Sequence, residues 1–157
     1  MKGSEYYTIH VRDIETNKLI TEKIQETSGS ITFSLDDKYI FYSKLDEHHR
    51  PRKIFRHKLG SSVLDDELIF EEKSEAFTVG LGISSDEKFF FITSSDHNTS
   101  EQYYFAVDEQ EPKPKLIQKR ERGIIYSVNS WDENFYKHTN KDCLLYTSPS
   151  PRDDRSS

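Results

Sequence analysis

A hairpin of the form Ser-x-Asp, followed by a run of aromatic and β-branched residues, occurs three times in this chain. The copies read SLDDKYIFYS, SSDEKFFFIT and SWDENFYKHT, and they cover residues 34–43, 84–93 and 130–139. Successive copies begin 50 and 46 residues apart. A period of roughly 20–50 residues is typical of repeat architectures, so the chain is predicted to consist of copies of one supersecondary unit.

The stretch from Ile31 to Lys73 contains one complete copy of that unit. Its four β segments read ITFSL, KYIFYSK, RKIFRHKLG and DELIFEEK, and clusters of turn-forming residues separate them. The third segment recurs as EYYTIHVRD and EQYYFAVDE, and the Leu-Ile pair of the fourth recurs at intervals of 49 and 48 residues. A four-stranded unit with this period is the signature of a β-propeller blade. We therefore expect an all-β fold, a partial β-propeller with four-stranded antiparallel blades.

The pattern within the strands agrees with this architecture. Residues 39–42 and 89–92 are apolar without interruption, which predicts strands buried on both faces between neighbouring blades. Tyr7, Ile9 and Val11 alternate with polar residues, as expected for a strand near the solvated rim.

The repeats predict a division of residues 1–142 into blades. The expected parts are an outer half-blade at 1–28, two whole blades at 29–75 and 76–122, and an inner half-blade at 123–142, about three blades in all. Closed propellers typically have about four to eight blades. Because both ends of this region fall within a blade, we expect a fragment of a larger ring, marginally stable or prone to aggregate when isolated.

Residues 143–157 depart from the blade pattern. The sequence CLLYTSPSPRDDRSS contains the only cysteine, Cys143, and is rich in Pro, Ser and Arg. Such a composition fits a disordered linker. Its first part also resembles the translation of a transposase-type sequencing adapter. Our expectation is therefore that the native sequence ends near Asp142 and that the tail is disordered or not native.

Composition limits the class of protein. The formal net charge of -6 disfavours a general nucleic-acid surface or an anionic-membrane surface. Ten Phe and nine Tyr are too many for a disordered acidic chain. No apolar run approaches the ~20 residues that span a bilayer. One cysteine permits no internal disulfide, so a cytoplasmic location is the default expectation.

Histidines and serines do not form a recognisable catalytic or metal-binding pattern. Four histidines are candidate metal ligands, but none has the spacing of a zinc site: His48, His49, His57 and His97. The serines without a His and an Asp in a triad-like arrangement nearby are Ser84, Ser94, Ser95 and Ser100. We interpret His57 as a structural residue of a blade strand. The segment Gly80–Ser84 lacks the third glycine of a dinucleotide-binding loop and precedes a strand, so no such loop is predicted.

Two charged clusters have a functional and a structural interpretation. The acids around the fourth strand are Asp65, Asp66, Glu71, Glu72 and Glu75. They would form an interface patch that attracts basic peptides, but a solvated outer strand is the favoured interpretation. The basic run Lys113–Arg122 alternates around Leu116 and Ile117, which favours a charged edge strand over a nucleic-acid patch. The sequence thus predicts no catalytic residue, no cofactor, no cofactor-binding residue and no metal ligand.

A more specific resemblance lies within residues 49–101. In order, this stretch shows Arg50–Pro51, the Arg-His-x-Leu-Gly sequence of Arg56–Gly60, the acid-rich strand of Asp66–Glu72, Phe77, and Thr99–Glu101. This order resembles the propeller domain of the prolyl oligopeptidase family, and within it most closely oligopeptidase B. The resemblance extends over residues 1–142.

The resemblance implies a serine-type endopeptidase in which a seven-bladed propeller caps an α/β-hydrolase domain and admits only short peptides. Oligopeptidase B members cleave after basic residues. The family's catalytic Ser, Asp and His lie in the hydrolase domain, and this chain contains no Gly-x-Ser-x-Gly nucleophile elbow. The implied partners are the hydrolase domain of the same parent chain and short peptide substrates, with no nucleic acid and no membrane.

Two functions remain open at this point. The first is a fragment of the non-catalytic gating propeller of a cytoplasmic serine oligopeptidase; because the triad is absent, whether the chain itself counts as an enzyme stays undecided. The second is a propeller that serves as a binding scaffold without a hydrolase domain. The fold does not decide between them. A hydrolase would require a nucleophile elbow followed in chain order by Asp and His.

Overall fold

A computed structural model describes residues 7–9, 11–12, 14–16, 24–132 and 134–140. The first copy of the repeated Leu-Ile pair, predicted as a strand at Leu19–Ile20, and the tail 143–157 lie outside the described residues. The chain divides into two compact units, residues 1–81 and 82–157. Regular structure in the described part consists of antiparallel strands and one short 3-10 helix, which confirms the all-β prediction. None of the described helical structure is long and apolar enough to cross a membrane.

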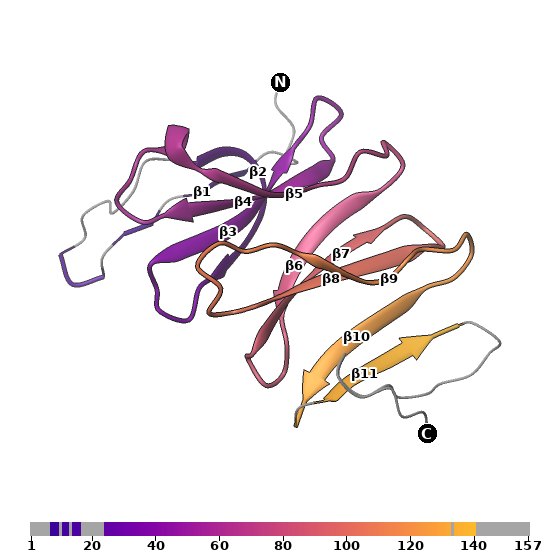
Figure 1. Cartoon of the computed structure of the whole chain (residues 1–157). Coiled ribbons are helices and arrows are strands. Elements are labelled where there is room, and N and C mark those ends of the chain that lie inside the picture. Colours follow the sequence, from indigo (N-terminus) through magenta and orange to yellow (C-terminus); the bar gives the residue numbers. More distant parts are fainter. Residues whose placement is uncertain (1–6, 10, 13, 17–23, 133, 141–157) are drawn as a thin grey trace. The chain divides into compact units, whose positions relative to one another are not determined.

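In the first unit, five strands form one sheet in the order β1-β2-β3-β4-β5 (Figure 1). The strands are β1 (Tyr7–Ile9), β2 (Ile24–Phe33), β3 (Tyr39–Leu45), β4 (Pro51–Lys58) and β5 (Glu67–Glu71). The 3-10 helix η1 (Val63–Asp65) lies between β4 and β5, and Ser62 caps it by accepting a hydrogen bond from the Leu64 amide. The four segments predicted within residues 31–73 are thus present as strands.

Strand β2 extends further toward the N-terminus than the segment predicted to start at Ile31. Thr27 lies opposite Tyr7 of β1 on one side and opposite Lys44 of β3 on the other, and the pairing with β3 continues to the end of β2. The register between β1 and β2 shifts by one residue, and Glu26 at this shift has a φ of 60°. A β-bulge with a left-handed residue bends the strand locally and increases its twist.

One hydrophobic cluster of the first unit lies on one face of this sheet. Its buried members are Ile9, Val11, Ile24, Ile40 and Tyr42, with Phe55, Leu59 and Val63 packed against them. The burial of Ile9 and Val11 and the exposure of Thr8 agree with the alternation predicted for this segment. Because burial of each large apolar side chain contributes roughly 1.5–3 kcal/mol, this cluster is a principal source of stability for the first unit.

A second sheet has the order β6-β7-β8-β9, and a hairpin follows it (Figure 1). The strands of the sheet are β6 (Thr78–Ile83), β7 (Phe89–Ser95), β8 (Ser100–Ala106) and β9 (Lys115–Gln118). The hairpin consists of β10 (Tyr126–Trp131) and β11 (Asn134–Thr139).

Strand β7 is buried on both faces, as predicted from its uninterrupted apolar sequence. On one face Phe90 contacts Phe105, with ring centroids 5.3 Å apart. On the other face the ring of Phe135 from β11 meets Phe89 and Phe91 edge to face, at 5.1 and 5.7 Å. Edge-to-face contacts add to the stabilisation from burial, so this aromatic cluster joins the β10–β11 hairpin to the sheet within the second unit.

The repeated hairpins have a common turn geometry in two of their three copies. Ser34 donates to Asp36 at 2.6 Å, and Ser84 donates to Asp86 at 2.6 Å. In the third copy Ser130 donates instead to Asp86, at 2.7 Å, and Asp132 takes a φ of 51°. The Asp86 carboxylate therefore accepts a hydrogen bond from a serine in each of two successive repeats. The sequence alone did not predict this connection between the repeats.

Candidate functional site

A buried polar network joins β3, β4 and the residue that precedes β5. The Nδ1 atom of His57 lies 2.5 Å from Oδ1 of Asp66, and the Tyr42 hydroxyl donates to Oδ2 at 2.5 Å. The His57 and Asp66 side chains are 0% and 3% exposed. Burial and the hydrogen bond to Asp66 raise the pKa of Tyr42 far above its ordinary value, so the hydroxyl remains a donor. These contacts agree with the interpretation of His57 as structural.

Two arginines of β4, Arg52 and the motif residue Arg56, bind other parts of the same unit. Arg52 donates to the main-chain carbonyl of Glu72 at 3.2 and 3.0 Å. The guanidinium of Arg56 lies over the Tyr39 ring, 4.2 Å from its centroid, and donates to Glu67 at 2.7 Å. The fork of arginine donors suits such multiple contacts. Both side chains thus connect β4 to its surroundings within the unit.

Thr99 and Ser100 connect β8 to the segment that leads into β10. The Thr99 hydroxyl accepts from the Gly123 amide at 2.9 Å. The Ser100 hydroxyl accepts from the Tyr126 amide and donates to the Tyr126 carbonyl, both at 2.8 Å. The Ser100 side chain thus satisfies both the amide and the carbonyl of Tyr126, as a neighbouring strand would otherwise do. These motif residues therefore position the start of the next repeat.

The Tyr126 hydroxyl fills an irregularity between β8 and β9. Where the pairing of the two strands shifts register, this hydroxyl accepts from the amides of Gln102 and Gln118, at 2.7 and 3.2 Å, and donates to the Gln118 carbonyl at 2.5 Å. The Gln102 side chain in turn accepts from the Val128 amide at 2.7 Å and donates to Thr93 at 2.8 Å. Burial raises the pKa of Tyr126.

Sequence reasoning did not single out Tyr126 or Gln102. The alternation of Tyr126 and Val128 with polar residues in β10 was the available signal, because it places both on the buried face. The pattern predicts burial but does not identify the partners, which lie on β8 and β9.

The candidate serines and histidines occupy separate places in the two units. Ser84 lies in a turn, Ser94 is buried within β7, Ser95 ends that strand, and Ser100 binds Tyr126. Of the candidate histidines, His48 and His49 in the β3–β4 loop and His97 after β7 are exposed. In the part of the chain that the structure describes, no group of three or more His, Cys, Asp or Glu is arranged to hold a metal ion.

The favoured interpretation of the acidic cluster is wrong for two of its five members. Asp65, Glu71 and Glu75 are exposed, as a solvated strand requires. Asp66 and Glu72 are instead buried. Asp66 binds His57 and Tyr42, and a Glu72 carboxylate oxygen accepts from the Ser74 amide at 2.8 Å. Each of these two carboxylates accepts hydrogen bonds, which offset the cost of its burial.

The basic run contains the edge strand of the second sheet, as predicted. Strand β9 lies last in the order β6-β7-β8-β9. The ammonium group of Lys115 lies 6.0 Å from the Tyr104 ring centroid. Arg120 turns back to β8, where its amide donates to the buried carboxylate of Glu101 at 3.0 Å and its Nε lies 3.8 Å from that group. Lys115 and Arg120 of the basic run therefore interact with residues of the same unit.

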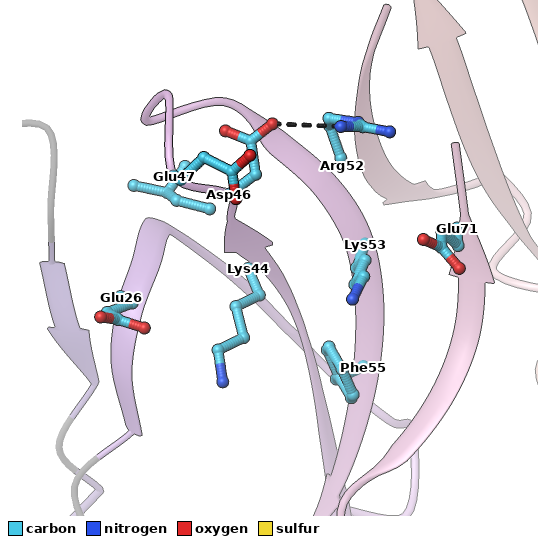
Figure 2. Close-up of a pocket in the computed structure, with 9 residues that line it drawn as sticks. Glu26, Lys44, Asp46, Glu47, Arg52, Lys53, Phe55 and Glu71 are labelled. Carbon is cyan, nitrogen blue, oxygen red and sulfur yellow. Dashed lines mark hydrogen bonds and ion pairs between the residues drawn. The ribbon is translucent and has the colours of Figure 1, made fainter. Parts of the chain in front are cut away.

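The first unit has an open pocket of about 500 Å³ at one end of its sheet (Figure 2). Charged side chains from four strands and the β3–β4 loop line it, together with two apolar residues. The lining residues are Glu26, Lys44, Leu45, Asp46, Glu47, Arg52, Lys53, Phe55 and Glu71. Asp46 pairs with Arg52 at 3.4 Å, and these side chains are 16% and 18% exposed. The pocket therefore combines a neutralised pair with further charges that face solvent.

The comparisons with known proteins point to one family. Residues 1–147 match the family model described as prolyl oligopeptidase, N-terminal beta-propeller domain. The chain is 38% identical to Protease 2 of Moraxella lacunata over 146 residues, which are 92% of this chain and 21% of that protein.

Two solved structures have the same fold. Oligopeptidase B from Leishmania major superposes with a TM-score of 0.88 at 25% identity, over 95% of this chain and 22% of that one. Oligopeptidase B from Trypanosoma brucei, solved in a closed form with covalently bound antipain, gives 0.75 at 26% identity, over 81% and 19%. The chain thus spans about a fifth of the length of these relatives. By sequence and by fold, the chain belongs to the prolyl oligopeptidase family and corresponds to its N-terminal propeller domain.

Proposed function

We propose that the chain forms part of the gating propeller of a serine-type oligopeptidase that acts on short peptides, with cleavage after basic residues. In this role the blades perform no bond-breaking chemistry. They form a rigid barrier that restricts access of substrates to a hydrolase domain of the same parent protein. That domain is expected to supply the catalytic residues.

The observation that carries the proposal is the use of the polar motif residues. His57, Asp66, Thr99, Ser100 and Glu101 all bind neighbouring strands or the segments that join them. Side chains that make these hydrogen bonds stabilise the blades, and they are poorly placed to act as a nucleophile or a general base. The similarity to Protease 2 and to two oligopeptidases B supports the choice of peptidase group.

We also propose that the parent protein acts in the cytoplasm. The only cysteine of the chain has no partner for an intrachain disulfide, and such a composition fits a reducing compartment. Cell fractionation with a tagged genomic copy tests this assignment. Co-purification with a cytosolic marker is expected, and recovery with periplasmic or secreted markers would contradict it.

The decisive test uses the complete reading frame of the gene. Sequencing is expected to find Gly-x-Ser-x-Gly followed by Asp and His. The purified product should cleave short peptides after Arg or Lys at least ~100-fold faster than after Pro, a difference of roughly 2.7 kcal/mol in transition-state stabilisation, and should leave casein intact. The control is a Ser-to-Ala variant of the elbow serine, which should be inactive.

Each alternative outcome has a definite meaning. A frame that ends once the last blade closes the ring, with no elbow, would support the binding-scaffold function instead. Hydrolysis after proline would retain the family and overturn the specificity. Degradation of casein at a rate similar to that of short peptides would overturn the gating role.

A further inference from the structure

Two lysines face each other directly in the pocket of the first unit. Lys44 on β3 and Lys53 on β4 occupy opposite positions in the antiparallel register. Figure 2 shows their side chains on the same face of the sheet, running in the same direction. Like charges directly opposite one another destabilise a strand pair. The arrangement therefore carries an electrostatic cost that a bound anion would remove.

Neither ammonium group is neutralised by an ion pair within the described part of the chain. Lys53 lies opposite Glu71 in the β4–β5 register, yet the two side chains do not come within ion-pair distance. The Nζ atom of Lys44 lies 5.8 Å from the centroid of the Phe55 ring, which attracts a cation without neutralising it. The space beside these groups is about 500 Å³ and is open to solvent.

Acidic residues flank the lysines on both sides. In Figure 2 the order across the sheet is Glu26, Lys44, Lys53 and Glu71, a negative-positive-positive-negative row. Formal charges in this row cancel, the Asp46–Arg52 pair is neutral, and Glu47 adds one further negative charge to the pocket lining. An anion is therefore favoured only where its charge lies between the two ammonium groups. A dianion would carry a second charge that both glutamates repel. The row thus favours a monoanion over a doubly charged phosphate.

We propose that Lys44 and Lys53 form a binding site for a single carboxylate, such as the C-terminal carboxylate of a peptide. Each lysine donates a charge-assisted hydrogen bond to one carboxylate oxygen, and Phe55 contacts the apolar part of the ligand. The inference concerns the first unit alone and does not depend on the proposed peptidase role.

The test is a titration of the full 157-residue chain, carrying 13C-labelled lysine, followed by NMR at the lysine ε-methylene groups. The probe is N-acetylglycine, with its neutral amide and inorganic phosphate as comparison ligands at constant ionic strength. Saturable shifts of two lysines are expected, with a dissociation constant on the order of millimolar. The amide should cause no saturable shift, and phosphate should bind more weakly than N-acetylglycine.

Four variants locate the site. Lys44→Met and Lys53→Met should each weaken binding about tenfold, the effect of losing one hydrogen bond between charged groups. Lys58→Met is the matched control, because Lys58 is an exposed lysine of the same strand β4 outside the pocket, and it should bind within about twofold of the wild type. Glu71→Gln removes a flanking charge and should tighten binding about threefold.

The Glu71→Gln variant keeps the proposal falsifiable even where a lysine variant fails to fold, because it predicts a gain. Weaker binding by this variant would overturn the proposal. Shifts that do not saturate, tighter binding of phosphate than of N-acetylglycine, or an equal loss in Lys58→Met would overturn it as well.

Discussion

Nδ1 of His57 lies 2.5 Å from Oδ1 of Asp66, and neither side chain is accessible to solvent beyond 3%. The two residues are nine positions apart in sequence, on β4 and in the residue just before β5. Together with Tyr42 they tie the segment around η1 to the middle of the sheet. The contact is the physical role of the histidine and acid in the family-like motif.

Asp66→Asn should destabilise the first unit by about 3 kcal/mol. The substitution leaves a buried imidazole and a buried hydroxyl without a charged acceptor, and loss of one partner of a buried pair is costly. Urea unfolding of the chain, followed by far-UV circular dichroism, measures the change. Asp65→Asn is the control, since Asp65 is exposed, and a comparable loss in that variant would contradict the assignment.

Tyr126→Phe should cost about 1–3 kcal/mol and weaken the junction between β8 and β9. It removes the acceptor of the Gln102 and Gln118 amides while leaving the ring in place. Hydrogen exchange of these two amides should accelerate more than that of the remaining β8 amides. Tyr136→Phe on β11 is the matched control and should leave both amides protected.

Glu87→Gly should stabilise the second unit by about 0.5–1 kcal/mol. Glu87 has a φ of 58°, a left-handed conformation that costs a side chain with a Cβ about 1–2 kcal/mol and costs glycine little. Glu87→Ala removes the carboxylate but keeps the Cβ, so it should give no gain. Equal urea midpoints for the two variants would show that the backbone conformation is not the source of the effect.

The tie between Ser130 and Asp86 should make the stability of the second unit sensitive to acid. Burial opposes ionisation of Asp86, but hydrogen bonds from Ser84, Ser130 and the Lys88 amide outweigh it and lower the pKa of this carboxyl group. A depressed folded-state pKa contributes stability above the unfolded value of about 3.9, and this contribution is lost as the pH falls through the folded pKa.

Ser130→Ala should therefore lower the free energy of unfolding by about 1 kcal/mol at pH 7, and the difference from wild type should shrink toward pH 3. Urea midpoints between pH 7 and pH 3 provide the measurement. Ser127→Ala, at an exposed position on the same strand, should change neither the midpoint nor its pH dependence. A difference for Ser130→Ala that stays constant over this range would rule out the link to Asp86.

The fold was predictable because its signals are local. Uninterrupted apolar runs at 39–42 and 89–92 specify strands buried on both faces, and acidic turns at a regular spacing specify hairpins. The proposed carboxylate site was less predictable from the sequence. Lys44 and Lys53 are nine residues apart in the chain, and only the register of β3 against β4 makes them opposite neighbours.

The sequence by itself determined the all-β class, the partial-propeller architecture and the family, since these depend on composition and on order along the chain. Tertiary structure decided which polar groups are buried. Asp66 and Glu72 belong to an acidic cluster that predicts a solvated strand, yet both are enclosed. The Tyr126 hydroxyl binds the amides of Gln102 and Gln118, which lie 24 and 8 residues before it, where the register of β8 and β9 shifts. Hydrogen-bond partners separated in this way are chosen by strand register and packing, which local sequence patterns do not encode.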